Sequence, residues 1–105
     1  MYAYKCITAY EGTRYNGWQK QGNTNNTIQG KIEEILSRQL GETVEICGSG
    51  RTDAGVHALG QVFHFHCNQE LDEASFLSAA NEHLPKDIRL LSIETCDGRF
   101  HARLN

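Results

Sequence analysis

The side chains best suited to do chemistry lie between Gly48 and Ala58, where the chain reads Gly-Ser-Gly-Arg-Thr-Asp-Ala-Gly-Val-His-Ala. Three glycines fall within the eight residues 48–55. Glycine lacks a Cβ atom and adopts positive φ angles, so such a loop turns sharply and lets another molecule approach its backbone. Asp53 supplies a carboxylate that could serve as a nucleophile or a general base. The segment therefore has the composition of a loop that faces a substrate.

Arg51 and Asp53 are two residues apart, so their side chains would project to the same side of a locally extended chain. The guanidinium would then orient the carboxylate and favour its ionised form, which nucleophilic or basic chemistry needs. A structural role is the alternative, because an aspartate in a glycine-rich turn often bonds its own backbone and Arg–Asp pairs are often structural. Spacing alone leaves both interpretations open.

Two phosphate-binding motifs are excluded at this segment. Gly48 and Gly50 are followed by Asp53 where a dinucleotide-binding fingerprint needs a third glycine. The span 50–55 has the glycine spacing of a P-loop, but Val-His follows it instead of Lys-Ser or Lys-Thr. A nucleoside triphosphatase is therefore not expected.

A second segment, Glu11–Asn26, carries three glycines among polar residues and predicts a long loop of the kind that is often functional. Arg14 and Lys20 are expected to contact phosphates of a nucleic acid. Trp18 could stack on a base or could pin the loop to the core. We favour a mixed role for the loop, in which Trp18 is mainly structural.

The elements that must hold these loops can be predicted from periodicity. Alternation of aromatic and β-branched residues predicts a strand over Tyr2–Tyr10. Apolar residues on one stripe predict a helix over Thr27–Leu40, capped by Asn26 or Thr27 and ended by Gly41.

The rest of the chain continues the alternation of strands and helices. Val44–Cys47 predicts a short second strand, and Gln61–Cys67 predicts a third whose apolar residues on both sides are compatible with cover on both faces. Asp72 is the expected N-cap of a second helix that Pro85 ends. A fourth strand is expected over Ile88–Ile93.

This order, β-α-β-β-α-β, predicts an α+β fold of the split, ferredoxin-like type, with two helices on one face of an antiparallel sheet. The other face would need a partner or a ligand. A small sheet with an open face is a frequent RNA-binding platform, although the topology hosts many functions.

Composition indicates one folded domain. The chain has 105 residues, of which 39% are hydrophobic and 22% charged. No apolar run approaches a membrane span and no signal peptide is evident, so a cytoplasmic protein is expected. Its cysteines form no C-x-x-C pair, so we expect reduced and mostly buried thiols at Cys6, Cys47, Cys67 and Cys96.

A metal site is a weaker interpretation of the histidines. His64 and His66 would share one strand face, and His57 and Cys67 lie nearby in sequence. No further ligand stands at a standard spacing, so no metal is expected.

The segment Gly50–Ala58 resembles, almost residue for residue, the catalytic loop of the tRNA pseudouridine synthase A family, which modifies uridines in the anticodon stem-loop. Further segments agree in the same order along the chain: Tyr10–Gln19, with Glu11 where aspartate is usual, Thr27–Gln29, Asn81–Pro85, Asp87-Ile88 and Phe100–Arg103. The resemblance covers nearly the whole chain.

This resemblance implies that Asp53 attacks the target uridine, on the base or at the sugar carbon, and that no cofactor or metal takes part. It implies that Arg51 orients the acid and helps to hold the opened RNA. The residues expected to contact RNA are Arg14, Trp18, Lys20, Gly50, Thr52 and His57.

Members of the family continue beyond the Phe-His-Ala-Arg segment into a second domain, which carries a tyrosine that stacks on the target base. Residues 1–105 are therefore expected to be the N-terminal catalytic-loop domain, inactive alone, of an enzyme that binds tRNA as a homodimer. Basic surface on the missing part would account for a net charge of −3, which otherwise argues against nucleic-acid binding.

Two other classes of function fit the same fold. A non-catalytic RNA-binding module would keep the fold and the basic loop without any chemistry at Asp53. A small-molecule or metal-binding domain of β-α-β-β-α-β topology would not bind tRNA at all. Replacement of Asp53 discriminates the enzyme from the RNA-binding module, and tRNA binding discriminates both from the third class.

Overall fold

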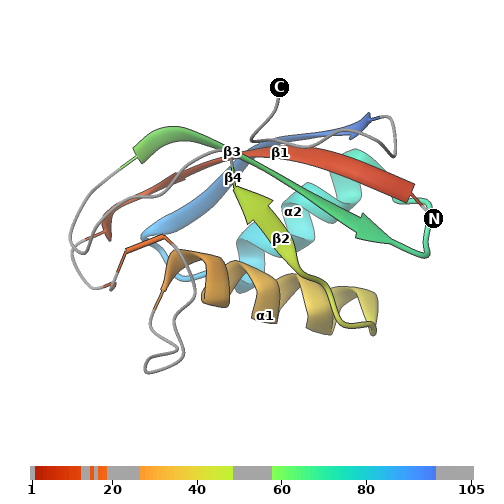
Figure 1. Ribbon diagram of the computed structural model, residues 1–105, viewed down its shortest axis with the longest axis horizontal. Helices are drawn as coiled ribbons and strands as arrows, with labels where there is room; N and C mark the ends of the chain where they lie inside the picture. Colours follow the sequence, from red (N-terminus) through yellow and green to blue (C-terminus); the bar gives the residue numbers. More distant parts are fainter. Residues whose placement is uncertain (1, 13–14, 16, 19–26, 49–57, 97–105) are drawn as a thin grey trace.

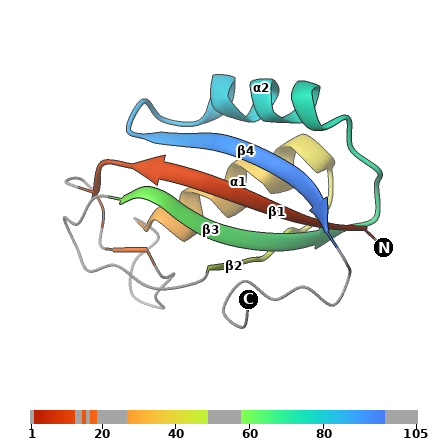
Figure 2. The same ribbon diagram turned by 90° about the horizontal axis from the view of Figure 1, so that it is seen from above.

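The computed structural model describes residues 2–12, 15, 17–18, 27–48 and 58–96. Its elements follow in the order β1 (Tyr2–Tyr10), α1 (Ile28–Leu40), β2 (Ile46–Gly48), β3 (Ala58–Cys67), α2 (Glu73–His83) and β4 (Ile88–Cys96). The strands form one antiparallel sheet in the order β2-β3-β1-β4 (Figure 2). Both helices lie on the same face of this sheet (Figure 1). The ferredoxin-like α+β fold predicted from the sequence is confirmed.

The core lies between the sheet and the two helices and is built from aromatic side chains of the central strands. Phe65 of β3 stacks with Tyr4 of β1 and with Phe76 of α2, at ring-centroid distances of 5.7 and 6.2 Å. From α1 the core receives the apolar stripe Ile28, Ile32, Leu36 and Leu40. Because these side chains are almost fully removed from water, their burial is the main stabilising contribution to the domain.

Helix α1 begins and ends where its sequence predicts. The Thr27 hydroxyl accepts a hydrogen bond from the Gly30 amide at 3.1 Å, and Gly41 adopts a left-handed conformation with φ of 68°. Helix α2 begins after Asp72 as predicted, but this side chain makes no capping bond to the backbone. Its carboxylate accepts the Ser75 hydroxyl at 3.0 Å, so Asp72 is the N-cap residue, as predicted, without a side-chain bond to the helix backbone.

Four strand boundaries differ from the prediction: both ends of β2, the start of β3, and the end of β4, which runs to Cys96 rather than Ile93. Strand β2 begins at Ile46, the first of its residues to pair with β3, and the backbone amide and carbonyl of Val44 are both bonded to the Ser37 hydroxyl. Strand β3 begins at Ala58, three residues before the predicted start at Gln61, because Ala58 pairs with Tyr10 across a register shift in β1. Pairing with a neighbouring strand outweighs the weak β propensity of Ala and Gly there.

The face of the sheet opposite the helices carries a row of polar residues across all four strands. Cys47 pairs with His64, His64 with Lys5 and Lys5 with Glu94 in the strand register. Lys5 and Glu94 form an ion pair at 2.6 Å. His64 is 5% exposed and His66 is half-buried, so the second face of β3 is partly covered.

The four cysteines are free thiols, as expected. Cys6 and Cys67 are buried, whereas Cys47 and Cys96 are half-buried. Among the described residues, no helix combines the length and the apolar character that crossing a bilayer takes.

Candidate functional site

Of the residues predicted to act on a substrate, the structure describes Trp18. The others lie outside the described residues: Arg14, Lys20, Gly50, Arg51, Thr52, Asp53 and His57. The surroundings of the site can therefore be built from the described residues on either side of the two loops.

Three of the four described ends of the two loops lie at one end of the sheet, and the fourth, Gly48, lies further along β3. Tyr10, the last residue of β1, pairs with Ala58, the first residue of β3. Gly48, the last residue of β2, pairs with Phe63 further along β3. Figure 1 shows the end of β1 and the starts of α1 and β3 on its left-hand side. The segments that lead into the predicted RNA-binding loop and the predicted catalytic loop thus share one region.

Trp18 lies in the core at this end of the sheet. Its indole is 2% exposed and packs between Tyr10, at 5.9 Å between ring centroids, and Phe63, at 6.1 Å. A Cβ atom on Gly48 would lie 2.5 Å from the indole nitrogen, so the backbone of β2 passes directly against the ring. This burial is the structural role expected of Trp18, and its expected contact with RNA stays a prediction.

The first turn of α1 binds the loop that precedes it. The amide of Ile28 donates to the Gly17 carbonyl at 3.1 Å, and the amide of Gln29 donates to the Trp18 carbonyl at 2.9 Å. The first amides of a helix have no partner within the helix, so they are available to hold a neighbouring segment. Here they fix the backbone on which Trp18 is carried.

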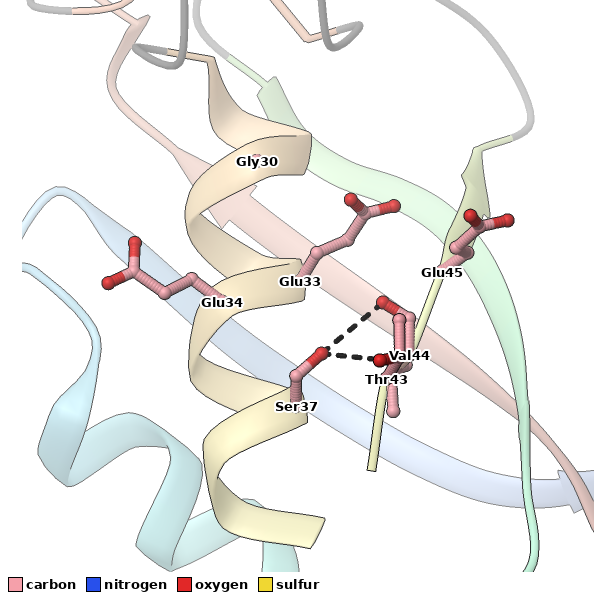
Figure 3. Close-up of a pocket in the computed structure, with 7 residues that line it drawn as sticks. All are labelled: Gly30, Glu33, Glu34, Ser37, Thr43, Val44 and Glu45. Atoms are coloured by element: carbon pink, nitrogen blue, oxygen red, sulfur yellow. Dashed lines mark hydrogen bonds between the residues drawn. The ribbon is translucent and has the colours of Figure 1, made fainter. Parts of the chain in front are cut away.

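The same turn of α1 binds the edge strand β2. The Gln29 side-chain amide donates to the Ile46 carbonyl, and the Glu33 carboxylate accepts the Ile46 amide, both at 3.0 Å. Gln29 also donates to Glu33 at 3.3 Å. Glu33 is 7% exposed, and Figure 3 shows its side chain extending from α1 toward β2. A buried carboxylate is costly unless it is hydrogen-bonded, and both of these donors bond its Oε2 atom.

The sequence interpretation did not single out Gln29 and Glu33, which bond the strand that precedes the predicted catalytic loop. The available signal is their spacing, because two polar side chains one helical turn apart stand beside the apolar stripe of α1. Their shared partner on β2 could not be predicted from spacing.

The other side of the first loop is held by Asp87, just before β4. Its carboxylate accepts the Tyr15 hydroxyl at 2.7 Å, and its carbonyl accepts the Glu11 amide at 2.9 Å. The Tyr15 amide in turn donates to the Gly12 carbonyl at 3.0 Å. The described residues of this loop are therefore anchored at both ends, by Asp87 and by α1.

The resolved pKa shifts among the described residues belong to the thiols Cys6 and Cys67. Burial raises the pKa of the Cys6 thiol, and nearby Cys96 adds to this effect. Burial also raises the pKa of the Cys67 thiol. Within the part of the chain that the structure describes, no three His, Cys, Asp or Glu side chains gather as metal ligands would.

Comparison with known proteins gives a consistent result. Residues 6–105 match the family model described as tRNA pseudouridine synthase. A protein of Bacillus cereus named tRNA pseudouridine synthase A 2 is 48% identical over 105 residues, which are 100% of this chain and 43% of the relative. A tRNA pseudouridine synthase A of an Exiguobacterium species is 50% identical over 99 residues, or 94% of this chain and 40% of the relative. The chain thus spans less than half the length of these relatives.

Proposed function

This chain belongs to the tRNA pseudouridine synthase family, and from that premise we propose that it carries the catalytic aspartate of an enzyme that converts uridine to pseudouridine in tRNA. The proposed substrate is a uridine in the anticodon stem-loop, and the proposed catalytic residue is Asp53. The observation that carries the proposal is the family match over residues 6–105, which contains the whole of the loop between β2 and β3.

In the proposed reaction, the Asp53 carboxylate forms a covalent bond to the target nucleotide, on the base or at the sugar carbon. The bond between the base nitrogen and the sugar is broken, the base turns, and a carbon of the same base bonds to the sugar. That carbon loses its proton and the nitrogen gains one, so no atom is gained or lost overall. Breaking the bond to Asp53 then regenerates the carboxylate. The covalent intermediate divides one difficult exchange into easier steps. The reaction is an isomerisation, so it needs no co-reactant.

The protein must also take the uridine out of its stack, which costs a few kcal/mol. We propose that Arg51 orients the carboxylate and holds the opened RNA, with Gly50, Thr52 and His57 as further contacts in the same loop. Arg14 and Lys20 of the first loop are proposed phosphate contacts. The anchoring of that loop to α1 supports this arrangement, because α1 also binds β2, from which the Asp53 loop continues.

In this proposal, the rest of the enzyme corresponds to the part of the relatives that this chain does not cover. We propose that residues 1–105 form the N-terminal catalytic-loop domain and that a second domain supplies the tyrosine that stacks on the base. The proposed assembly is a homodimer in the cytoplasm, with a basic cleft for tRNA.

The test is Asp53→Asn in the full-length protein that contains these residues. Pseudouridine formation, measured on an anticodon stem-loop transcript, should be abolished while tRNA binding is retained, because Asn keeps the size but loses the nucleophilic oxygen. Retained activity would rule out Asp53 as the nucleophile. Binding of tRNA without pseudouridine formation by the unsubstituted protein would favour the RNA-binding module.

A further inference from the structure

The first turn of α1 contacts both segments that lead into the two loops. From this junction we infer that Gln29, Glu33 and Trp18 are positioning residues that fix where the chain enters the Asp53 loop. The inference rests on the proposed function, since it concerns the same loop.

Strand β2 needs such support because it is short and lies at an edge of the sheet. It has three residues, from Ile46 to Gly48, and it pairs with β3 alone. Its first residue is bound through both backbone polar groups to Gln29 and Glu33. The helix therefore sets the position of β2 along the edge at its first residue.

Trp18 fixes the other end of β2. The indole nitrogen would lie 2.5 Å from a Cβ atom on Gly48, and the neighbouring ring carbon Cε2 would lie 2.8 Å from it. The indole is itself held by Tyr10 and Phe63, and its backbone is held by the Gln29 amide. Gln29 takes part at both ends of β2: its side chain binds Ile46, and its backbone amide binds the Trp18 carbonyl.

The direction in which the chain leaves Gly48 matters because Asp53 follows five residues later. A misplacement of a reacting group by about 1 Å can lower a rate by about 100-fold. Loss of the contacts at Ile46 or Gly48 should therefore lower the rate of the chemical step. Binding of tRNA should be less affected, because phosphate contacts spread over a large surface supply most of its affinity.

The chain offers a matched control one helical turn away. The Ser37 hydroxyl accepts the Val44 amide at 2.9 Å and donates to the Val44 carbonyl at 3.4 Å (Figure 3). Ser37 thus makes the same kind of clamp as Gln29 and Glu33, on the segment before β2. A substitution at Ser37 removes helix-to-chain bonds without touching β2 itself.

The experiment compares Glu33→Ala, Glu33→Gln and Ser37→Ala in the full-length protein. Single-turnover pseudouridine formation and tRNA binding are measured separately, together with unfolding by urea. Glu33→Ala should lower the single-turnover rate by about tenfold or more, with tRNA affinity changed by less than about twofold. Glu33→Gln should recover most of the rate, because its amide oxygen can still accept the Ile46 amide. Ser37→Ala should lose stability and keep its rate.

The inference is overturned if Glu33→Ala and Ser37→Ala lose stability alike while both keep the unsubstituted rate. It is also overturned if Glu33→Gln is as slow as Glu33→Ala, because the charge rather than the clamp would then matter. If Glu33→Ala does not fold, Gln29→Ala carries the same test through the Ile46 carbonyl. Asp53→Asn in the same assay separates the two proposals, since its retained activity would refute the proposed function and not only the positioning role.

Discussion

The two edge strands of the sheet are each clamped by a helix, but the clamps differ in construction. At β4, the single side chain of Asn81 binds both polar groups of Leu90, at 2.8 Å to the amide and 2.9 Å to the carbonyl. At β2, the equivalent groups of Ile46 are shared between Gln29 and Glu33. Strand β4 has nine residues and pairs with β1 along nearly its whole length, whereas β2 has three. The clamp is one support among many at β4 and a principal support at β2.

Because the two strands differ in length, the side-chain bonds have different roles at β4 and at β2. A long ladder holds β4 in register whether or not Asn81 is present, so its clamp adds free energy of folding. The short strand β2 has few ladder bonds of its own, so its clamp also sets its position. The predicted catalytic loop follows β2 in the chain, so we expect the bonds from Gln29 and Glu33 to affect the position of its first residues.

The largest expected effect on stability comes from breaking the clamp at β4. Asn81→Ala leaves two backbone groups of Leu90 without their side-chain partner, which costs about 1–3 kcal/mol for each group that stays unsatisfied. Unfolding by urea measures this loss. The single-turnover rate below the unfolding transition should stay unchanged. A rate loss as large as that of Glu33→Ala would remove the distinction between the two edges.

The contact between Trp18 and Gly48 can be tested with a pair of glycine substitutions. Gly48→Ala forces a Cβ atom against the indole and should destabilise the protein by about 1–3 kcal/mol and slow pseudouridine formation. Gly60→Ala is the control, because its Cβ atom would have Ile7 as nearest contact, at 3.8 Å. Equal unfolding midpoints and equal rates for the two variants would show that Trp18 does not constrain β2.

The buried Cys6 thiol of the central strand β1 should make the stability of the protein depend on alkaline pH. Burial raises the pKa of the Cys6 thiol, so the folded protein keeps this proton while the unfolded chain releases it near the ordinary thiol pKa of ~8.5. The contribution of Cys6 is therefore complete below that pH and declines above it, by up to about 1.4 kcal/mol per pH unit. Urea unfolding at pH values from about 8 to about 10, around the ordinary thiol pKa, should show this decline in the free energy of unfolding. In Cys6→Ala the slope should be shallower, and an unaltered slope would assign it to another group.

The smallest expected difference concerns the two helix starts. Thr27→Ala removes a capping bond from α1 and should cost about 1 kcal/mol, whereas Thr27→Ser should keep most of it. Asp72→Ala should cost less, because Asp72 contributes to α2 by its charge near the helix start and by its bond to Ser75. Thermal unfolding of the three variants measures the order, and a larger loss for Asp72→Ala would contradict it.

The sequence predicted the order of elements because each carries a clear local signal. The stripe from Ile28 to Leu40 and the glycine at position 41 define α1 without any knowledge of its neighbours. The start of β2 could not be predicted, because it is set by the pairing of Ile46 with Phe65, which lies on a strand further along the chain. The start of β3 depends likewise on its partner Tyr10.

The candidate site was predicted in the same uneven way. The sequence interpretation favoured a mainly structural Trp18, and the structure gives its partners Tyr10 and Phe63. The roles of Gln29 and Glu33 were missed because they depend on a strand 13 or more residues away in sequence. Asp53 and the residues around it stay predictions, because they lie outside the described residues.

The clamps on Ile46 and Leu90 also bear on the solubility of the protein at high concentration. The outer strands of an open sheet can recruit strands from other molecules and so begin the growth of fibrils. Here helix side chains already bind the amide and the carbonyl of one residue on each outer strand, Asn81 at Leu90 and Gln29 with Glu33 at Ile46. These four hydrogen bonds leave fewer backbone groups on the outer strands of the described sheet open to a strand from another molecule.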